Sequence, residues 1–110
     1  MYEVKKRIEI SASHKLNLPY DSKCSEIHGH NWIITVFCRC ESLNGQGMVI
    51  DFSDIKSIVN KKMDHKNLND QFDFNPTAEN MAKWFCDNIQ NCFKVIVQES
   101  ENNIATYIKG

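Results

Sequence analysis

The sequence lacks an apolar run long enough to cross a membrane. Its apolar stretch from Trp32 to Cys38 is interrupted by Thr35, whereas a membrane-spanning helix needs about 20 consecutive apolar residues. The opening residues alternate charged and apolar side chains, so they also lack the continuous apolar core of a secretory signal. We therefore expect a cytoplasmic protein with no membrane partner.

An excess of charge of one sign is missing as well. Thirteen basic residues stand against fourteen acidic ones, which gives a formal net charge of -1, and neither sign forms a long run. A surface for nucleic acid is built on concentrated positive charge. We therefore expect no nucleic-acid partner.

The five cysteines contain no Cys-x-x-Cys pair. Their count is odd, and Cys38 and Cys40 lie two residues apart in a predicted strand, so their side chains point to the same side. A disulfide framework is therefore a poor explanation, and a structural zinc site built from cysteines is not expected. We predict reduced thiols and interpret four of them as buried, inert residues: Cys38, Cys40, Cys86 and Cys92.

The remaining composition predicts one globular domain over residues 1–110. The chain is 42% hydrophobic and 25% charged, as ordinary folded proteins are. Its length falls in the range of ~100–150 residues where single domains cluster. No repeat, low-complexity tract or domain boundary interrupts it.

Hydrophobic periodicity predicts strands near both ends of the chain. In residues 2–14 apolar and polar side chains alternate, the pattern of a half-buried strand, and His14 closes this strand on its buried side. Residues 31–41 are rich in β-branched and aromatic side chains, which favours a central strand. Residues 48–50 are expected to return as a short antiparallel strand after a turn. Residues 93–97 and 104–108 are predicted to pair as a hairpin.

Two helices are predicted between the strands. The first is capped by Asp51, and the second starts at Asn75-Pro76, a cap candidate followed by a proline suited to the first helical position. The apolar stripe of the first helix is Phe52, Ile55, Val59 and Met63, and that of the second is Ala78, Met81, Ala82, Phe85 and Ile89. Two strands, two helices and two strands in this order predict an α+β fold, with a four-stranded antiparallel sheet and both helices on one face.

The histidines give the first chemical signal. His28-Gly29-His30 puts two imidazoles two residues apart, which in an extended chain points both to the same side. Adding His14 completes three neutral nitrogen donors, and three protein ligands with one open position is the arrangement of catalytic zinc. Pairs of surface histidines around a glycine share this spacing, so spacing alone leaves both interpretations open.

Three further features suit proton transfer or substrate binding. Cys24 precedes His28 by four residues, and a thiol held near a metal can lose its proton near neutral pH and act as a base, unless it is simply buried and inert. Asp64 could orient a proton-transferring His65, although the pair also suits a polar loop at a helix end. Glu99 ends an apolar strand, where it could accept two N–H donors from a heterocycle or equally be solvated.

Taken together, these residues resemble the 6-pyruvoyltetrahydropterin synthase family, and especially its 6-carboxytetrahydropterin synthase branch of the queuosine pathway. Six ordered motifs carry the resemblance over nearly the whole chain. They are Ala12-Ser13-His14, Cys24 to His30, Ile50-Asp51-Phe52, Met63-Asp64-His65 with Leu68-Asn69-Asp70, Pro76-Thr77-Ala78-Glu79-Asn80, and Gln98-Glu99-Ser100.

The resemblance implies a tunnelling fold, in which small subunits associate through their sheets into a barrel and form sites between subunits. The homo-oligomer that it implies is a hexamer of two trimers. The residue roles that it implies are Zn²⁺ ligands for His14, His28 and His30, proton transfer for Cys24, Asp64 and His65, and pterin binding for Glu99 and Thr77.

The reaction implied by the resemblance is that of a carbon–oxygen and carbon–carbon lyase. It would convert 7,8-dihydroneopterin triphosphate to 6-carboxy-5,6,7,8-tetrahydropterin with release of acetaldehyde and triphosphate. The branch rests on the short gap between Cys24 and His28, because pyruvoyl-forming enzymes tend to have a longer one. A 6-pyruvoyltetrahydropterin synthase and a non-catalytic module that binds zinc or pterin stay open as alternatives.

Overall fold

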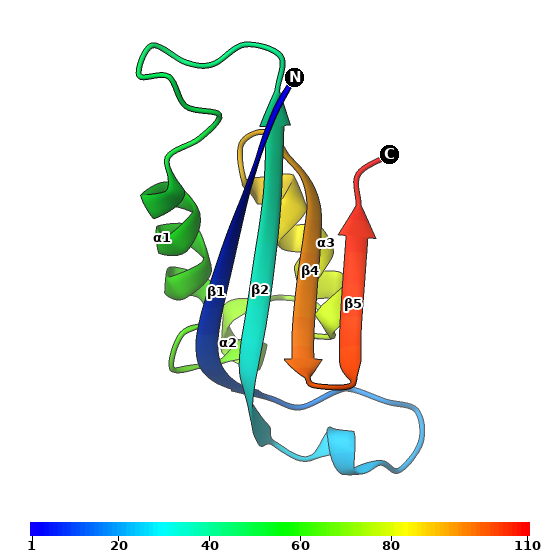
Figure 1. The fold of residues 1–110 in the computed structure, drawn as a ribbon. Coiled ribbons are helices and arrows are strands. Elements are labelled where there is room, and N and C mark those ends of the chain that lie inside the picture. Colours follow the sequence, from blue (N-terminus) through cyan, green and yellow to red (C-terminus); the bar gives the residue numbers. More distant parts are fainter.

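Two long antiparallel strands form the spine of the sheet (Figure 1). In the computed structural model, which describes residues 1–110, β1 (Tyr2–His14) pairs with β2 (His28–Cys40) from Tyr2 opposite Cys40 to His14 opposite His28. The predicted bounds of β1 are confirmed. The second strand starts three residues before the predicted position 31, because the histidine motif is itself part of the ladder.

The sheet has five strands in the order β3-β1-β2-β4-β5, not the four that we predicted. The C-terminal hairpin of β4 (Cys92–Ser100) and β5 (Asn103–Ile108) is confirmed. The additional strand is β3 (Lys66–Asn67), which pairs in parallel with Ala12 and Ser13 of β1. Two residues are too few to show an alternating pattern, so sequence periodicity could not reveal this strand.

The predicted return strand at residues 48–50 is wrong. Asn44 holds this segment as a turn, because its backbone N–H donates to the Met48 carbonyl at 3.0 Å and its Oδ1 accepts from the Met48 N–H at 3.0 Å. The Val49 carbonyl accepts from Asn91 Nδ2 at 2.9 Å. Val49 and Ile50 are buried in the core without joining the sheet.

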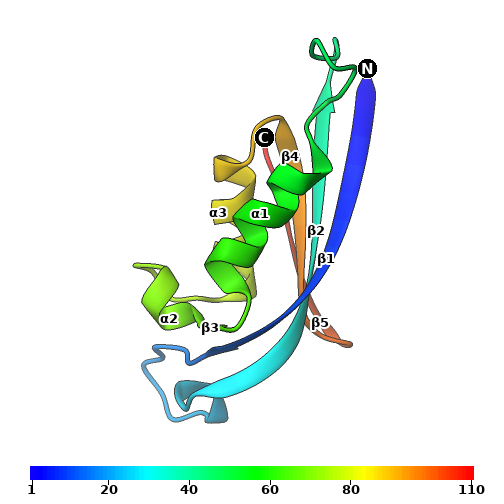
Figure 2. The same ribbon diagram turned by 90° about the vertical axis from the view of Figure 1, so that its left-hand side faces the viewer.

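The helices all lie on one side of the sheet and leave its other face uncovered (Figure 2). Helix α1 (Phe52–Met63) is capped as predicted, since Asp51 Oδ1 accepts from the Ser53 N–H at 2.8 Å. Its buried residues are Ile55, Val59 and Met63. Phe52 was predicted in this stripe but is 47% exposed, because it is the first helical residue and lies beyond the packed turns.

Helix α3 (Ala78–Asn88) starts two residues later than predicted, and its cap is Thr77 in place of Asn75. Thr77 Oγ1 accepts from the Asn80 N–H at 3.1 Å. Asn75 instead accepts from the Asn17 N–H at 2.9 Å and so ties the loop after β1 to the start of the helix. The predicted stripe of Ala78, Met81, Ala82, Phe85 and Ile89 is buried, as expected.

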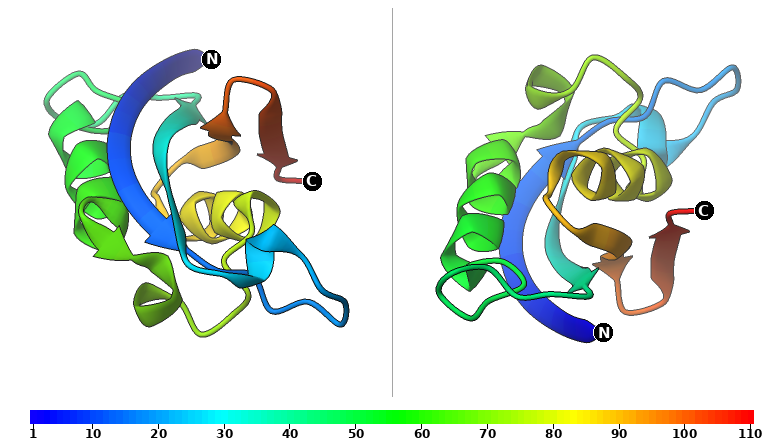
Figure 3. Two further views of the ribbon diagram at one scale, coloured as in Figure 1. Left: turned by 90° about the horizontal axis from the view of Figure 1, so that it is seen from below. Right: turned by 90° about the horizontal axis from the view of Figure 1, so that it is seen from above.

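A short helix, α2 (Leu68–Gln71), was not predicted. It lies in the polar stretch between α1 and α3, and only Leu68 within it is fully buried. Viewed along the strands, α1 lies beside β1, whereas α3 lies against β4 and β5 (Figure 3). The two long helices thus cover different halves of the sheet and enclose one core between them.

The core agrees with the predicted chemistry of the cysteines. All five are free, and Cys38, Cys86 and Cys92 are buried in the core cluster. Cys40 was expected to be buried but is half-buried, because it is the last residue of β2. No helix of the structure is long and apolar enough to span a membrane.

Candidate functional site

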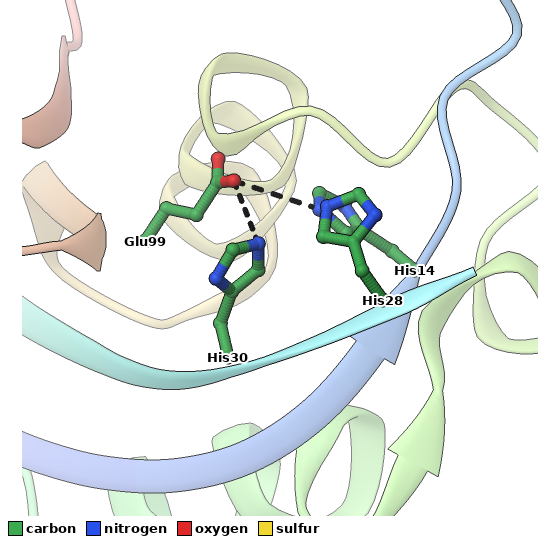
Figure 4. A group of neighbouring side chains, drawn as sticks. All are labelled: His14, His28, His30 and Glu99. Atoms are coloured by element: carbon green, nitrogen blue, oxygen red, sulfur yellow. Dashed lines mark ion pairs between the residues drawn. The ribbon is translucent and has the colours of Figure 1, made fainter. Parts of the chain in front are cut away.

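The three histidines of the predicted metal site lie together at one end of the sheet (Figure 4). His14 and His28 are cross-strand partners, and His30 is two residues further along β2 on the same face. Ring centroids are 4.5 Å apart for His14 and His28, 4.8 Å for His28 and His30, and 5.4 Å for His14 and His30. The strand register alone therefore brings these three imidazoles together.

Backbone carbonyls hold two of the rings in one orientation. His14 Nδ1 is 2.8 Å from the Pro76 carbonyl oxygen, and His28 Nδ1 is 2.8 Å from the Glu26 carbonyl oxygen. A carbonyl oxygen only accepts, so each Nδ1 carries the proton and each Nε2 keeps its lone pair. A hydrogen bond of this kind is the usual outer support of a metal-binding histidine.

The Nε2 atoms of His14 and His30 are buried and make no hydrogen bond of good geometry, which is costly for polar atoms removed from water. The Glu99 carboxylate lies only 2.8 Å from the His30 Nε2 atom, but it does not meet the angle that a hydrogen bond requires. One donor atom each from His14, His28, His30 and Glu99 lies within 4.8 Å of the others. A metal ion would satisfy these atoms at once, so the residues fit the metal that the sequence predicts.

Burial sets the charge of the site. The His14 side chain is 0% exposed and that of His30 is 21% exposed. Desolvation by burial lowers the pKa of both imidazoles, and this effect outweighs the opposing influence of the Glu99 carboxylate. Both rings are therefore neutral at pH 7, which is the form that binds a metal. Trp32 closes the apolar side, with its ring centroid 4.9 Å from that of His14.

The Glu99 side chain lies beside the three histidines. Its position near the end of a predicted strand did not indicate this proximity. Its Oε1 is 2.8 Å from His30 Nε2 and 3.8 Å from His14 Nε2, and its side chain is 22% exposed. It also lines a cleft of about 380 Å³ between the start of α3 and the β4–β5 hairpin. The carboxylate thus borders both the donor cluster and an open space.

The Asp64-His65 pair lies elsewhere on the chain. The His65 side chain is 84% exposed, and its Nε2 is 3.8 Å from Asp64 Oδ1. Its backbone has φ 56°, an uncommon conformation for a non-glycine residue, and its N–H donates to the Ser11 carbonyl at 2.7 Å. His65 lines a cleft of about 530 Å³ together with His30 and with Ser11 and Asn31, and the side chains of the last two face away from the helices.

Cys24 and Thr77 sit next to elements that support the histidines. Cys24 lies in a single 3-10 turn, Lys23–Ser25, and is half-buried. Its carbonyl accepts from the Leu16 N–H at 2.6 Å, which closes the loop leading into His28. Thr77 follows Pro76, whose carbonyl orients His14. Within one chain, neither residue contacts Asp64 or His65.

Known proteins match this chain over nearly its whole length. A family model described as "6-pyruvoyl tetrahydropterin synthase" matches residues 3–109. The "6-carboxy-5,6,7,8-tetrahydropterin synthase" of Bacillus subtilis is 30% identical, with 96% of this chain and 84% of the relative covered. The "6-pyruvoyl tetrahydrobiopterin synthase" of Homo sapiens is 34% identical, with 96% and 90% covered.

A solved structure from the same family has a similar fold. The structure of Caenorhabditis elegans 6-pyruvoyl tetrahydropterin synthase superposes with a TM-score of 0.78 at 28% identity, covering 99% of this chain and 96% of that one. The predicted tunnelling fold is therefore confirmed, with the five-stranded sheet in place of a four-stranded one.

Proposed function

The chain belongs to the 6-pyruvoyl tetrahydropterin synthase family, whose members process pterins, and from this premise we propose a specific reaction for it. The substrate is 7,8-dihydroneopterin triphosphate, which with water gives 6-carboxy-5,6,7,8-tetrahydropterin, acetaldehyde and triphosphate. No external reductant is required, because the ring gains the electrons that the side chain loses. The observation that carries the proposal is the cluster of three histidines beside Glu99, at the edge of an open cleft.

The metal in this proposal is zinc, held by His14, His28 and His30. Three nitrogen donors with a further position are the ligand set of catalytic zinc sites. Bound zinc would lower the pKa of a side-chain hydroxyl of the substrate and polarise the carbonyl that develops from it. The Nδ1 bonds to the Pro76 and Glu26 carbonyls support the assignment, because they keep two Nε2 lone pairs directed at one point.

Proton transfer in this proposal belongs to Cys24 and to His65, supported by Asp64. The thiol acts as a base on one side of the substrate side chain, and the imidazole carries a proton on the other side. Asp64 stabilises the protonated form of His65, from which it is 3.8 Å away.

A second subunit completes the site in this account. His65 is 84% exposed beside the edge strand β3 and on the cleft that faces away from the helices. In one chain its ring makes no hydrogen bond or ion pair with the three histidines, whose side chains lie on the helix side of the sheet. A neighbouring copy in a hexamer of two trimers can supply it, and a fully active monomer in sedimentation under assay conditions would refute this arrangement.

Glu99 and Thr77 bind the pterin ring in the proposal. The pterin presents two adjacent N–H donors, and a carboxylate can accept both. Glu99 borders the cleft between α3 and the hairpin, which offers space for a flat ring. Thr77 caps α3 and directly precedes Ala78, which lines this cleft.

The gap between Cys24 and His28 supports the carboxy-forming branch and a place in queuosine biosynthesis. The 34% identity to the human 6-pyruvoyl tetrahydrobiopterin synthase favours the pyruvoyl-forming reaction as the second candidate. Both use the same residues and the same substrate. The products alone separate them.

The test is mass spectrometry of the products after zinc-loaded protein is incubated with the substrate. The proposal expects 6-carboxytetrahydropterin with acetaldehyde. A pyruvoyl product would move the protein to the second candidate, and unchanged substrate would leave a binding module. Cys24→Ala should abolish turnover while zinc stays bound, whereas Cys40→Ala, at the far end of β2, should change neither.

A further inference from the structure

Glu99 has no charged partner except the histidine cluster. The carboxylate forms ion-pair contacts with His14 and His30 and with no lysine or arginine. The Nε2 atoms of both imidazoles are buried and make no hydrogen bond of good geometry. The charge of the Glu99 carboxylate thus faces the three imidazoles (Figure 4). A divalent cation placed between them matches this charge better than water does.

The backbone directs Glu99 toward the histidines. The pairing of β4 with β5 shifts register between Gln98 and Ser100, so Glu99 is the extra residue of a bulge. The pairing of β4 with β2 ends at Gln98, opposite Ile33. Val95 and Val97 are buried on the helix side of β4, and Glu99 follows them at the same two-residue spacing. The strand alternation therefore places the Glu99 side chain on the face that carries the histidines, at the bulge where the regular pairing with β5 ends.

We propose that Glu99 is the fourth metal ligand in the substrate-free protein, and that a bound pterin ring takes this carboxylate from the metal. This inference rests on the proposed function. Three imidazoles and one carboxylate supply four donors within 4.8 Å of one another, the number that a tetrahedral zinc site needs. Glu99 then binds the metal before the substrate arrives and the pterin ring afterwards, but never both at once.

The exclusion follows from the shape of the ring. Its two adjacent N–H donors lie on the pyrimidine edge, at the opposite end of the bicycle from the C6 side chain that would reach the metal. A carboxylate that accepts both N–H donors of such a ring lies a ring's length from the metal, so Oε1, which faces the histidines, has to leave them. The ring and the metal therefore compete for the same carboxylate. The coordination position that the substrate side chain requires becomes open only after the ring is in place, which protects the empty site from reactions with other ligands.

The first test measures zinc affinity against a competing chelator in the absence of any pterin. Glu99→Gln should weaken binding by roughly 100-fold or more, beyond the 10–100-fold typical of losing an outer partner. Glu99→Asp should also weaken it, because the shorter side chain keeps the charge but loses the reach. Glu101→Gln removes the same charge from the exposed hairpin turn and should leave affinity unchanged.

The opposite results overturn the ligand assignment. Wild-type affinity in Glu99→Gln would show that the carboxylate does not bind the metal. Wild-type affinity in Glu99→Asp would show that it acts through charge alone. Circular dichroism of the metal-free variants ensures that folded proteins are compared.

The second test adds unsubstituted pterin, which has the ring and no side chain to bind the metal. If the metal and the ring compete for Glu99, each must lower the affinity of the protein for the other by the same factor. Pterin should therefore weaken zinc binding in the wild type and change the visible spectrum of the cobalt-loaded protein. Glu99→Gln should show neither effect. Pterin that binds without coupling refutes the exchange and leaves the proposed function intact. Pterin that does not bind refutes both, whereas the chelator titration still decides whether Glu99 is a ligand.

Discussion

Truncating His14 and His28 separately should distinguish their structural roles from their shared role as metal ligands. His14 is fully buried and its Nδ1 satisfies the Pro76 carbonyl, whereas His28 is half-buried at the start of β2. Both variants should lose zinc. Only His14→Ala should lose much stability in metal-free buffer.

The size of this difference follows from the contacts. Replacing a large buried side chain by alanine costs about 2–5 kcal/mol, and leaving the Pro76 carbonyl without a partner adds roughly 1–3 kcal/mol. The same substitution removes the buried Nε2 atom that has no hydrogen bond, and this gain offsets a similar amount of the lost stability. We therefore expect a net loss of about 2–4 kcal/mol for His14→Ala and about 1 kcal/mol for His28→Ala.

Thermal unfolding in the presence of a chelator, and again with zinc, measures both effects. A loss of 1 kcal/mol lowers Tm by roughly 4 °C or more in a domain of this size. Zinc at 100 times its Kd should stabilise the wild type by about 2.7 kcal/mol and both variants far less. His65→Ala is the matched control, because it removes the same side chain at an exposed position. Equal stabilisation of all proteins by zinc would refute the assignment of the cluster.

Three further predictions follow from the same structure. Burial lowers the pKa of His14 and His30 below the ordinary value of about 6.5, so the unfolded chain binds more protons than the folded one at acidic pH. The metal-free protein should therefore lose stability as pH falls below about 6.5, and a flat urea midpoint from pH 7.5 to 5.5 would contradict this. Thr77→Ala removes the cap of α3 and should cost about 1 kcal/mol in urea unfolding, whereas exposed Thr106→Ala should cost almost nothing; equal losses would count against the cap. His65→Ala should lower turnover by 10²–10⁴-fold with zinc content unchanged in metal analysis, and normal turnover would remove His65 from the reaction.

The features that periodicity specifies could be read from the sequence. The alternation in residues 2–14 placed His14 on the buried face, and the register of β1 with β2 then set it opposite His28. The spacing of Ile55, Val59 and Met63 likewise gave the buried side of α1. A regular pattern over many residues reports which face is buried, so these predictions were confirmed.

Features that depend on single tertiary contacts could not be predicted. β3 consists of two residues and has no periodic signal. The turn that starts at Asn44 was predicted, but residues 48–50 do not join the sheet after it, because the Val49 carbonyl accepts from the Asn91 side chain. The alternation of Val95 and Val97 marks the face on which Glu99 lies, but its meeting with the histidines depends on the pairing of β4 with β2, which periodicity does not specify. The start of α3 was misplaced because Asn75 and Thr77 are both good caps, and the contact with Asn17 decides between them.

The most direct test of the central claim follows metal content and turnover together while zinc is returned to metal-stripped protein. The account predicts no product without metal, product formation that rises in proportion to bound zinc up to one ion per chain, and neither binding nor turnover in His28→Ala. Full conversion of 7,8-dihydroneopterin triphosphate by the metal-free protein, or by His28→Ala, would contradict the account.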